Sequence, residues 1–98
     1  MKLLPITYRI MIDNGESIEV YGLAVDAKCK VRICVRNVSS VGIYPEWVAD
    51  HYDTGYRIIG KGVHRTPEDA ANAAVSIIER NIVSGKYDSC IAAIRAKS

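Results

Sequence analysis

The segment from Thr66 to Gly85 constrains the fold more than any other part of the chain. Thr66 is a residue type that caps helix N-termini, and Pro67 fits a first helical position, where no N–H is needed. Glu68 and Asp69 follow, and their negative charge is favourable beside the unpaired N–H groups of a first turn. Gly85 suits the left-handed position that ends many helices. Together these signals predict one long helix.

One face of this helix carries small and aliphatic side chains at helical spacing: Ala70, Ala71, Ala74, Val75, Ile78 and Ile82. Small side chains let a helix lie close to a sheet, whose larger residues fill the space opposite. A second, short helix is expected over Ser89–Ala96, with Asp88 as its cap. Its inward-facing residues would be Cys90, Ile91 and Ile94.

The first third of the chain has the alternating pattern of half-buried strands. Ile6–Ile12 alternates, and Asp13-Asn14-Gly15 is typical of a hairpin turn. A second strand is expected over Glu16–Val25, where the apolar residues change parity. We expect a bulge at Gly22 to return both sets to one core face. A third strand is expected over Lys28–Val35.

The middle of the chain leaves two alternatives. Glu46–Tyr52 is expected to be a strand, because Asp53-Thr54-Gly55 would then turn the chain into a further strand over Tyr56–Val63. The alternative is a short helix with Pro45 at its first position. The predicted fold class is α+β: an antiparallel meander of four to five strands packed by one long Ala-rich helix, with a short C-terminal helix, in a single domain over residues 1–98.

Composition favours a chain that works in the cytoplasm. Hydrophobic residues make up 49% of the 98 residues, yet no run approaches the roughly 18 apolar residues of a membrane span. Residues 1–5 are too short for a secretory signal. The three cysteines are an odd number and form no Cys-x-x-Cys pair, which is typical of a reducing compartment. No membrane association and no cofactor are expected.

Candidate catalytic and metal-binding residues are few. An enzyme acting through His51 or Cys34 is the least supported function, because no spacing pairs a nucleophile with a base. His64 precedes the helix cap and is expected to be a surface residue. Asp50, His51 and Asp53 form a small polar cluster, but strand alternation places Asp50 and His51 on opposite faces, so no metal site is predicted.

The sequence Gly60-Lys61-Gly62 lies before the long helix, as glycine-rich phosphate-binding loops do. It lacks the remaining residues of those motifs, and the negative charges at the start of the helix would repel a phosphate. A close approach of the helix to the strand, or a bulge, explains the glycines instead.

Two surface features point to a partner. Tyr44, Trp47, Tyr52 and Tyr56 gather in one predicted hairpin region, and such residues are enriched at protein interfaces; the alternative is that they fill the core. Lys28, Lys30, Arg32 and Arg36 share one face of the third predicted strand. This basic row predicts nucleic-acid binding or, alternatively, a solvated face whose charges Glu16 and Glu19 balance.

The segment Gly60–Ala74, GKGVHRTPEDAANAA, resembles the last strand and helix of double-stranded-RNA-binding domains, and it is similar to the related strand–helix unit of HicB-type antitoxins. The resemblance covers about a quarter of the chain and implies a strand-to-helix layout. Where the RNA-binding family has a lysine cluster at the helix start, this chain has Thr66-Pro67-Glu68-Asp69, which argues against RNA binding there.

The sequence therefore predicts a non-enzymatic protein-binding module, with another protein or a second copy of itself as partner. Nucleic-acid binding is the alternative. The small size and the sheet-plus-helix layout are similar to inhibitors carried by phages and mobile elements, anti-CRISPR proteins among them, which is a likeness of fold class alone.

Overall fold

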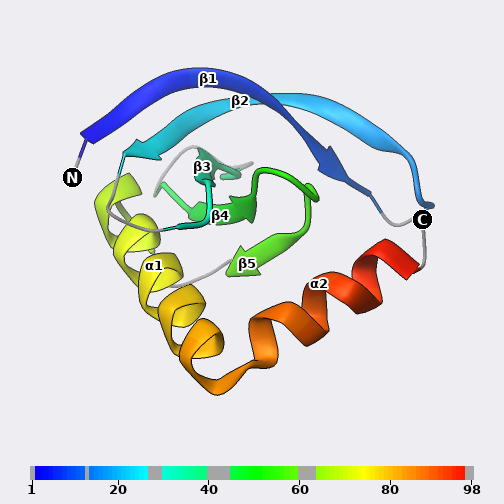
Figure 1. The fold of residues 1–98 in the computed structure, drawn as a ribbon. Coiled ribbons are helices and arrows are strands. Elements are labelled where there is room, and N and C mark those ends of the chain that lie inside the picture. Colours follow the sequence, from blue (N-terminus) through cyan, green and yellow to red (C-terminus); the bar gives the residue numbers. More distant parts are fainter. Residues whose placement is uncertain (1, 13, 27–29, 40–44, 60–63, 97–98) are drawn as a thin grey trace.

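The computed structural model describes residues 2–12, 14–26, 30–39, 45–59 and 64–96, and it contains five strands and two helices (Figure 1). In chain order these are β1 (Lys2–Met11), β2 (Ser17–Asp26), β3 (Ile33–Asn37), β4 (Trp47–His51), β5 (Arg57–Ile59), α1 (Pro67–Ser84) and α2 (Lys86–Ala96). The strands form one antiparallel sheet in the order β1-β2-β3-β4-β5. The predicted α+β fold with a meander sheet is confirmed.

The ends of α1 follow the predicted signals. The Thr66 Oγ1 accepts a hydrogen bond from the Asp69 N–H at 3.1 Å, and Pro67 is the first helical residue. At the other end Gly85 has a left-handed backbone with φ of 81°, and its N–H donates to the Ile82 carbonyl at 3.2 Å. The next helix starts immediately, so α2 begins at Lys86 and not at Ser89 as predicted.

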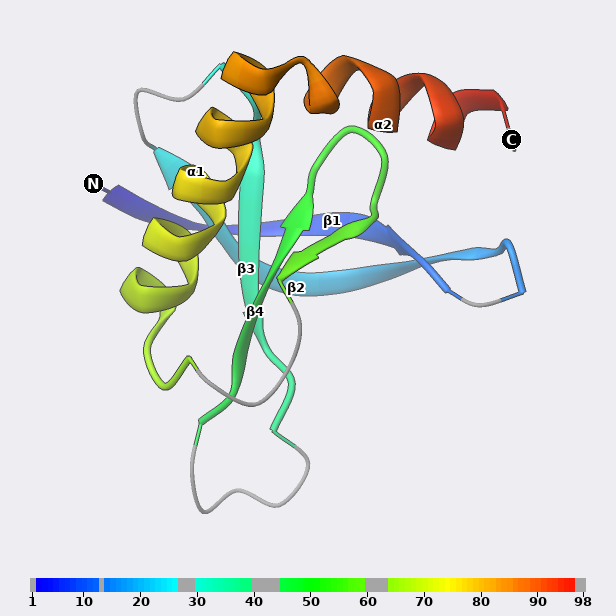
Figure 2. The same cartoon turned by 90° about the horizontal axis from the view of Figure 1, so that it is seen from below.

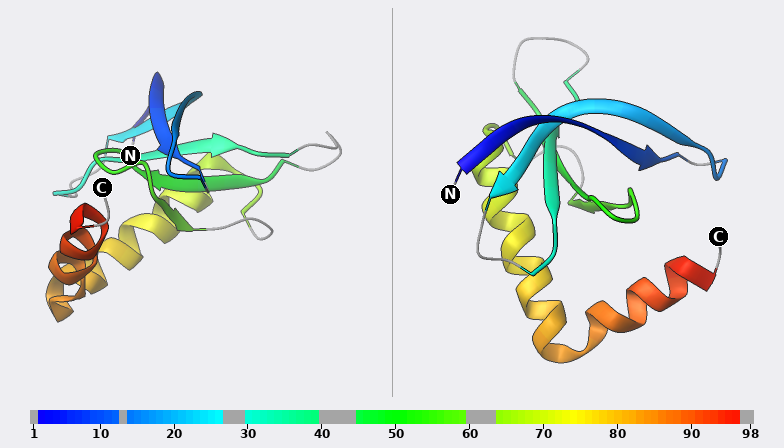
Figure 3. Two further views of the ribbon diagram at one scale, coloured as in Figure 1. Left: turned by 90° about the vertical axis from the view of Figure 1, so that its right-hand side faces the viewer. Right: turned by 45° about the horizontal axis from the view of Figure 1, so that its top comes forward.

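Helix α1 covers one face of the sheet and forms what we call the helix-side core (Figure 3). The helix contributes its small and aliphatic stripe, and β3, β4 and β5 contribute the residues opposite. The buried members are Val31, Ile33, Val35, Ala49, Ile59, Ala70, Ala71, Ala74 and Ile78. Burial of this apolar surface is the main favourable contribution to folding.

A second core, the hairpin-side core, lies on the opposite face of the sheet. The β1–β2 hairpin crosses β3 and β4 at a steep angle and arches over them (Figures 1 and 2). Tyr8 and Ile10 from β1 are thereby buried against Cys34 of β3. The sheet is therefore buried on both faces in its centre, although it is antiparallel and has a helix on only one side.

This second core corrects the prediction of a bulge at Gly22. The β1–β2 register runs without a shift from Lys2↔Asp26 to Met11↔Ser17. Val20 packs into the hairpin-side core, whereas Leu23 and Val25 pack into the helix-side core. The apolar residues of β2 therefore change parity because they fill two cores, one on each face of the sheet. The β1–β2 ladder needs no bulge to accommodate them.

Two other predictions are adjusted. The third strand spans Ile33–Asn37 and not Lys28–Val35, so Lys30 and Arg32 lie before the strand. Residues 47–51 form a strand, so the short-helix alternative is wrong. The bend at 53–55 joins β4 to β5 as predicted, while residues 60–63 lie outside the described part of the chain.

The open edge of β1 contacts the turn between β4 and β5 at one point. The Met11 N–H donates to the Gly55 carbonyl at 3.0 Å, so it faces away from β2. Because backbone groups alternate in direction along a strand, those of Leu3, Pro5 and Thr7 also face outward. Pro5 has no N–H, so the open edge of β1 lacks a donor at its centre, a known guard against edge-to-edge pairing.

Candidate functional site

The most enclosed polar side chain of the described residues is the Asp50 carboxylate, near the C-terminal end of β4. The residue is 1% exposed. Its Oδ2 accepts a hydrogen bond from the Tyr8 hydroxyl at 2.7 Å and another from the Arg36 Nε at 2.8 Å. Arg36 is itself mostly buried, with a side chain that is 12% exposed. The network joins β1, β3 and β4 on the hairpin side of the sheet.

Burial keeps the neighbouring groups of Asp50 protonated. It raises the pKa of the Tyr8 phenol far above its ordinary value of 10, and the hydrogen bond to Asp50 acts in the same direction. Burial and, secondarily, the charge of Asp50 raise the pKa of the Cys34 thiol to about 11. At neutral pH the phenol is therefore a hydrogen-bond donor, and the thiol is not an activated nucleophile.

A pocket of about 460 Å³ opens beside this network. Its lining residues are Ile10, Met11, Ile12, Arg36, Asp50, Gly55 and Arg57. Arg57 lies on β5 directly across from Asp50 in the sheet register, and Arg36 reaches Asp50 from β3 on the other side. Two arginines and one buried carboxylate thus share a pocket with three apolar side chains.

The imidazole of His51 lies on the opposite face, between β4 and α2. The Thr54 backbone N–H donates to its Nδ1 at 3.2 Å, so Nδ1 carries no proton. The Nε2–H therefore donates to the Tyr87 hydroxyl, which lies 2.9 Å away. His51 and Cys34 point to opposite sides of the sheet, so they do not form the nucleophile–base pair considered from the sequence.

This environment predicts a pH dependence of stability. Burial lowers the pKa of His51 from its ordinary value of 6.5; the charge of Asp53 opposes this and that of Arg95 adds to it. The unfolded chain then takes up the proton at higher pH than the folded chain does. The contribution of neutral His51 to the free energy of unfolding is present in full above about pH 6.5. It is lost as the pH falls toward the pKa of His51 in the folded chain.

Urea unfolding at pH 7.5 and 5.5 tests this expectation. The loss of stability at the lower pH should be smaller in His51→Gln than in the wild type, by no more than about 1 kcal/mol per pH unit. Equal losses in His51→Gln and the wild type would contradict the assignment of a buried neutral imidazole.

The structure does not gather the predicted aromatic residues into one patch. Trp47 packs against the helix-side core, whereas Tyr52 packs against the hairpin-side core, where the Arg32 guanidinium lies 4.5 Å from its ring centre. Tyr56 lines a groove of about 170 Å³ beneath α2. Tyr44 lies outside the described residues. Trp47 thus takes the core role that the sequence left as an alternative.

The predicted basic row is also divided. Arg36 is buried against Asp50, and Arg32 forms an exposed ion pair with Asp53 at 2.9 Å. The balancing acids are thus Asp50 and Asp53, where Glu16 and Glu19 were expected. Lys30 is exposed in the bend before β3, and Lys28 lies outside the described residues. The row is not a continuous basic strip on one strand.

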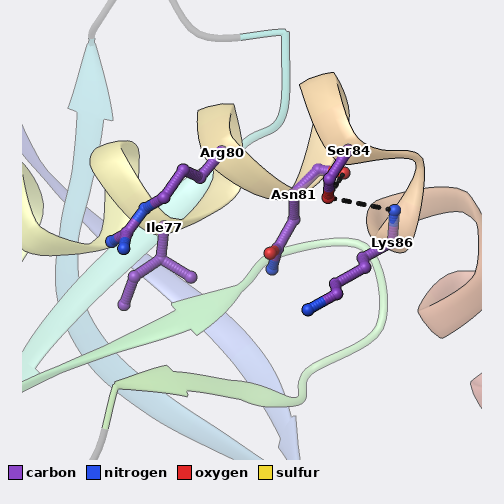
Figure 4. Close-up of a pocket in the computed structure, with 5 residues that line it drawn as sticks. All are labelled: Ile77, Arg80, Asn81, Ser84 and Lys86. Carbon is purple, nitrogen blue, oxygen red and sulfur yellow. Dashed lines mark hydrogen bonds between the residues drawn. The ribbon is translucent and has the colours of Figure 1, made fainter.

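A further hollow of about 320 Å³ lies at the junction of α1 and α2 (Figure 4). Its residues are Ile77, Arg80, Asn81, Ser84 and Lys86. The Ser84 hydroxyl accepts a hydrogen bond from the Lys86 backbone N–H at 3.5 Å, which helps to fix the sharp turn between the helices. No nucleophile–base pair is present among these residues, and the described part of the chain holds no cluster of metal-binding side chains.

Sequence reasoning misses the central residue of the site. It places Asp50 in a small polar cluster with His51 and Asp53, and it singles out neither Tyr8 nor Arg57. One signal is available: Val48 and Tyr52 share the parity of Asp50, while Trp47 and Ala49 share the other parity. A strand that is apolar on both faces is buried on both faces, and an acid within it then requires a partner.

Comparison of the chain with protein-family models, with curated proteins and with solved structures gives no match. The resemblance to double-stranded-RNA-binding domains and HicB-type antitoxins remains a prediction. In the described residues no helix has the length and apolar character that crossing a membrane requires.

Proposed function

We propose that the chain is a non-enzymatic protein-binding module that docks on its partner through the β1–β2 hairpin. One observation carries this proposal. Four large apolar residues of the described chain are exposed, and three of them lie on this hairpin. Leu4 and Ile18 are on the face that carries Tyr8, and Tyr21 is on the opposite face. The turn end of the hairpin extends beyond the rest of the sheet (Figure 2). A highly exposed aromatic side chain on such a projecting element is a candidate anchor for a protein partner.

Tyr21 is the proposed anchor of this surface. Its side chain is 73% exposed, and it lies opposite Thr7 in the β1–β2 register, next to the Arg9↔Glu19 pair. A tyrosine among polar and charged neighbours is a composition typical of protein interfaces, because the ring buries a large area at low entropic cost. The proposal thus moves the anchor from the predicted Tyr44, Trp47, Tyr52 and Tyr56 set to the hairpin.

We propose further that the chain acts by docking on its partner and not by catalysis. With the Cys34 thiol protonated and His51 on the other face, docking rather than chemistry is the activity that the described residues support. An inhibitor encoded by a phage or mobile element, which blocks a partner by covering its surface, is the form we propose. We place its action in the cytoplasm, where free thiols such as those of Cys34 and Cys90 persist.

The test is affinity capture from the source organism, followed by binding measurements with the purified partner. Tyr21→Ala should weaken binding about thirtyfold or more, the loss typical of an interface anchor. Val83→Ala is the matched control, because Val83 is 90% exposed but lies on α1. Both side chains are exposed, so both variants should fold. Sedimentation equilibrium of the purified chain shows whether a second copy is the partner.

Two results would contradict the proposal. Tyr21→Ala and Ile18→Ser could bind the partner as tightly as the wild type does, which would remove the hairpin from the interface. Alternatively, the chain could bind duplex or single-stranded nucleic acid with an affinity that falls steeply with salt. That result would favour the basic residues Lys28, Lys30, Arg32 and Arg36 as the functional surface.

A further inference from the structure

We infer that the pocket between β1, β4 and β5 binds a carboxylate with a short apolar body. The pocket has a volume of about 460 Å³ and is lined by Arg36, Asp50 and Arg57 together with Ile10, Met11, Ile12 and Gly55. This site is separate from the exposed hairpin residues of the proposed interface. Its ligand is defined by the charge and shape of the lining.

The net charge of the residues that line the pocket favours a ligand with a single negative charge. Two arginines and one aspartate leave a formal surplus of one positive charge. Asp50 is turned inward, where its Oδ2 holds the Tyr8 hydroxyl and the Arg36 Nε. Among the described residues Arg57 has no ion pair, and Arg36 forms none besides that with Asp50. The surplus charge is therefore that of Arg57 and the outer edge of the Arg36 guanidinium.

The Asp50 network holds Arg36 in place for such a ligand. Its Nε is fixed at 2.8 Å from Asp50 Oδ2, and its side chain is 12% exposed. A guanidinium that is held on one edge loses little entropy when its other edge binds a planar carboxylate. The partial burial also excludes water, which strengthens a charge-assisted hydrogen bond.

The remaining walls favour an organic anion over an inorganic one. Ile10, Met11 and Ile12 present apolar surface at the end of β1, and the volume holds a few carbon atoms beside the charged group. A doubly charged phosphate would exceed the single surplus charge and would lie near Asp50. A carboxylate on an aliphatic body fits both the charge and the apolar wall. It can belong to a free small molecule or to an acidic side chain of a bound protein.

The test is an NMR titration of the intact chain with isovalerate, using neutral isovaleramide of the same shape as the matched probe at equal ionic strength. Isovalerate should shift the backbone signals of residues 10–12, 55 and 57 and saturate in the millimolar range. Isovaleramide should leave them in place. The peptide acetyl-Ile-Glu-Ile-amide is the second arm: tighter binding than isovalerate assigns the carboxylate to a protein side chain, and weaker binding assigns it to a free small molecule.

Variants connect the binding to the pocket. Arg57→Glu should weaken isovalerate binding about tenfold or more, the loss expected when a hydrogen bond to a charged group is removed. Arg57→Gln replaces it if Arg57→Glu fails to fold. Arg80→Glu makes the same charge change on α1, outside the pocket, and should bind as the wild type does.

Three results would overturn the inference: equal shifts with isovaleramide, unchanged binding in both Arg57 variants, or tighter binding of inorganic phosphate than of isovalerate. The titration needs no protein partner. Tyr21→Ala should leave it unchanged, so failure of this site and failure of the proposed hairpin interface are distinguishable.

Discussion

Replacement of Asp50 by alanine should lower the free energy of unfolding by about 3–5 kcal/mol, as measured by urea denaturation at pH 7. The variant leaves the guanidinium of Arg36 mostly buried without its counter-charge and removes the acceptor of the Tyr8 hydroxyl. An uncompensated charge in a low-dielectric interior is among the most destabilising changes in proteins. The variant tests whether the network holds the hairpin onto the sheet.

Two variants separate the buried network from ordinary losses of charge. Asp53→Ala breaks the Arg32 pair, whose side chains are 71% and 47% exposed, and should lower stability by less than about 1 kcal/mol. The double variant Asp50→Leu with Arg36→Met removes both buried charges and should recover part of the loss. If Asp50→Ala costs no more than Asp53→Ala, the network does not stabilise the fold.

Replacement of Gly55 by alanine is the second change with a large expected effect, about 3 kcal/mol of destabilisation. The backbone of Gly55 has φ of 75°, which costs an alanine about 1–2 kcal/mol. A Cβ there would also lie 2.9 Å from the Arg9 carbonyl and 2.9 Å from the Met11 nitrogen. This steric conflict adds about 1–3 kcal/mol, because β1 must move away from the β4–β5 turn.

Gly15→Ala is the matched control for this prediction. Gly15 has a similar φ of 81°, but a Cβ added there would meet no atom within 4 Å. Its alanine variant should show the cost of the backbone conformation alone, about 1–2 kcal/mol. The excess in Gly55→Ala, measured by the same urea titration, is the contribution of close packing. Equal losses in the two variants would contradict the contact between β1 and the turn.

The sequence is most informative where the determinants are local. The Thr66 cap and the Gly85 terminus lie within a few residues of the backbone groups that they satisfy, so α1 can be predicted at both ends. The strand over residues 47–51 is favoured by the turn after it, because turn residues at 53–55 are typical of a connection between two strands. Short-range chemistry of this kind is visible in a single chain.

The site is not visible in the sequence because its contacts are long-range. Tyr8 and Asp50 are 42 positions apart, and no periodicity in either strand indicates that they meet. The change of parity at Gly22 indicates a bulge only if the sheet has one buried face. Once the hairpin arches over the sheet, the same pattern describes two buried faces. That arch brings Tyr8 to Asp50, whereas Arg36 and Arg57 lie near Asp50 through the β3–β4 and β4–β5 pairings.

Pro5, on the open edge of β1, also affects whether molecules of this chain associate with one another. Ten residues of extended chain at a sheet border would ordinarily invite another molecule to continue the ladder, and repetition would produce filaments. Pro5 interrupts the row of donors midway, while the far end of that row is already engaged by Gly55. Pairing of a second chain along that border is thus weakened at its middle and blocked at one end, which disfavours open-ended growth in a concentrated solution.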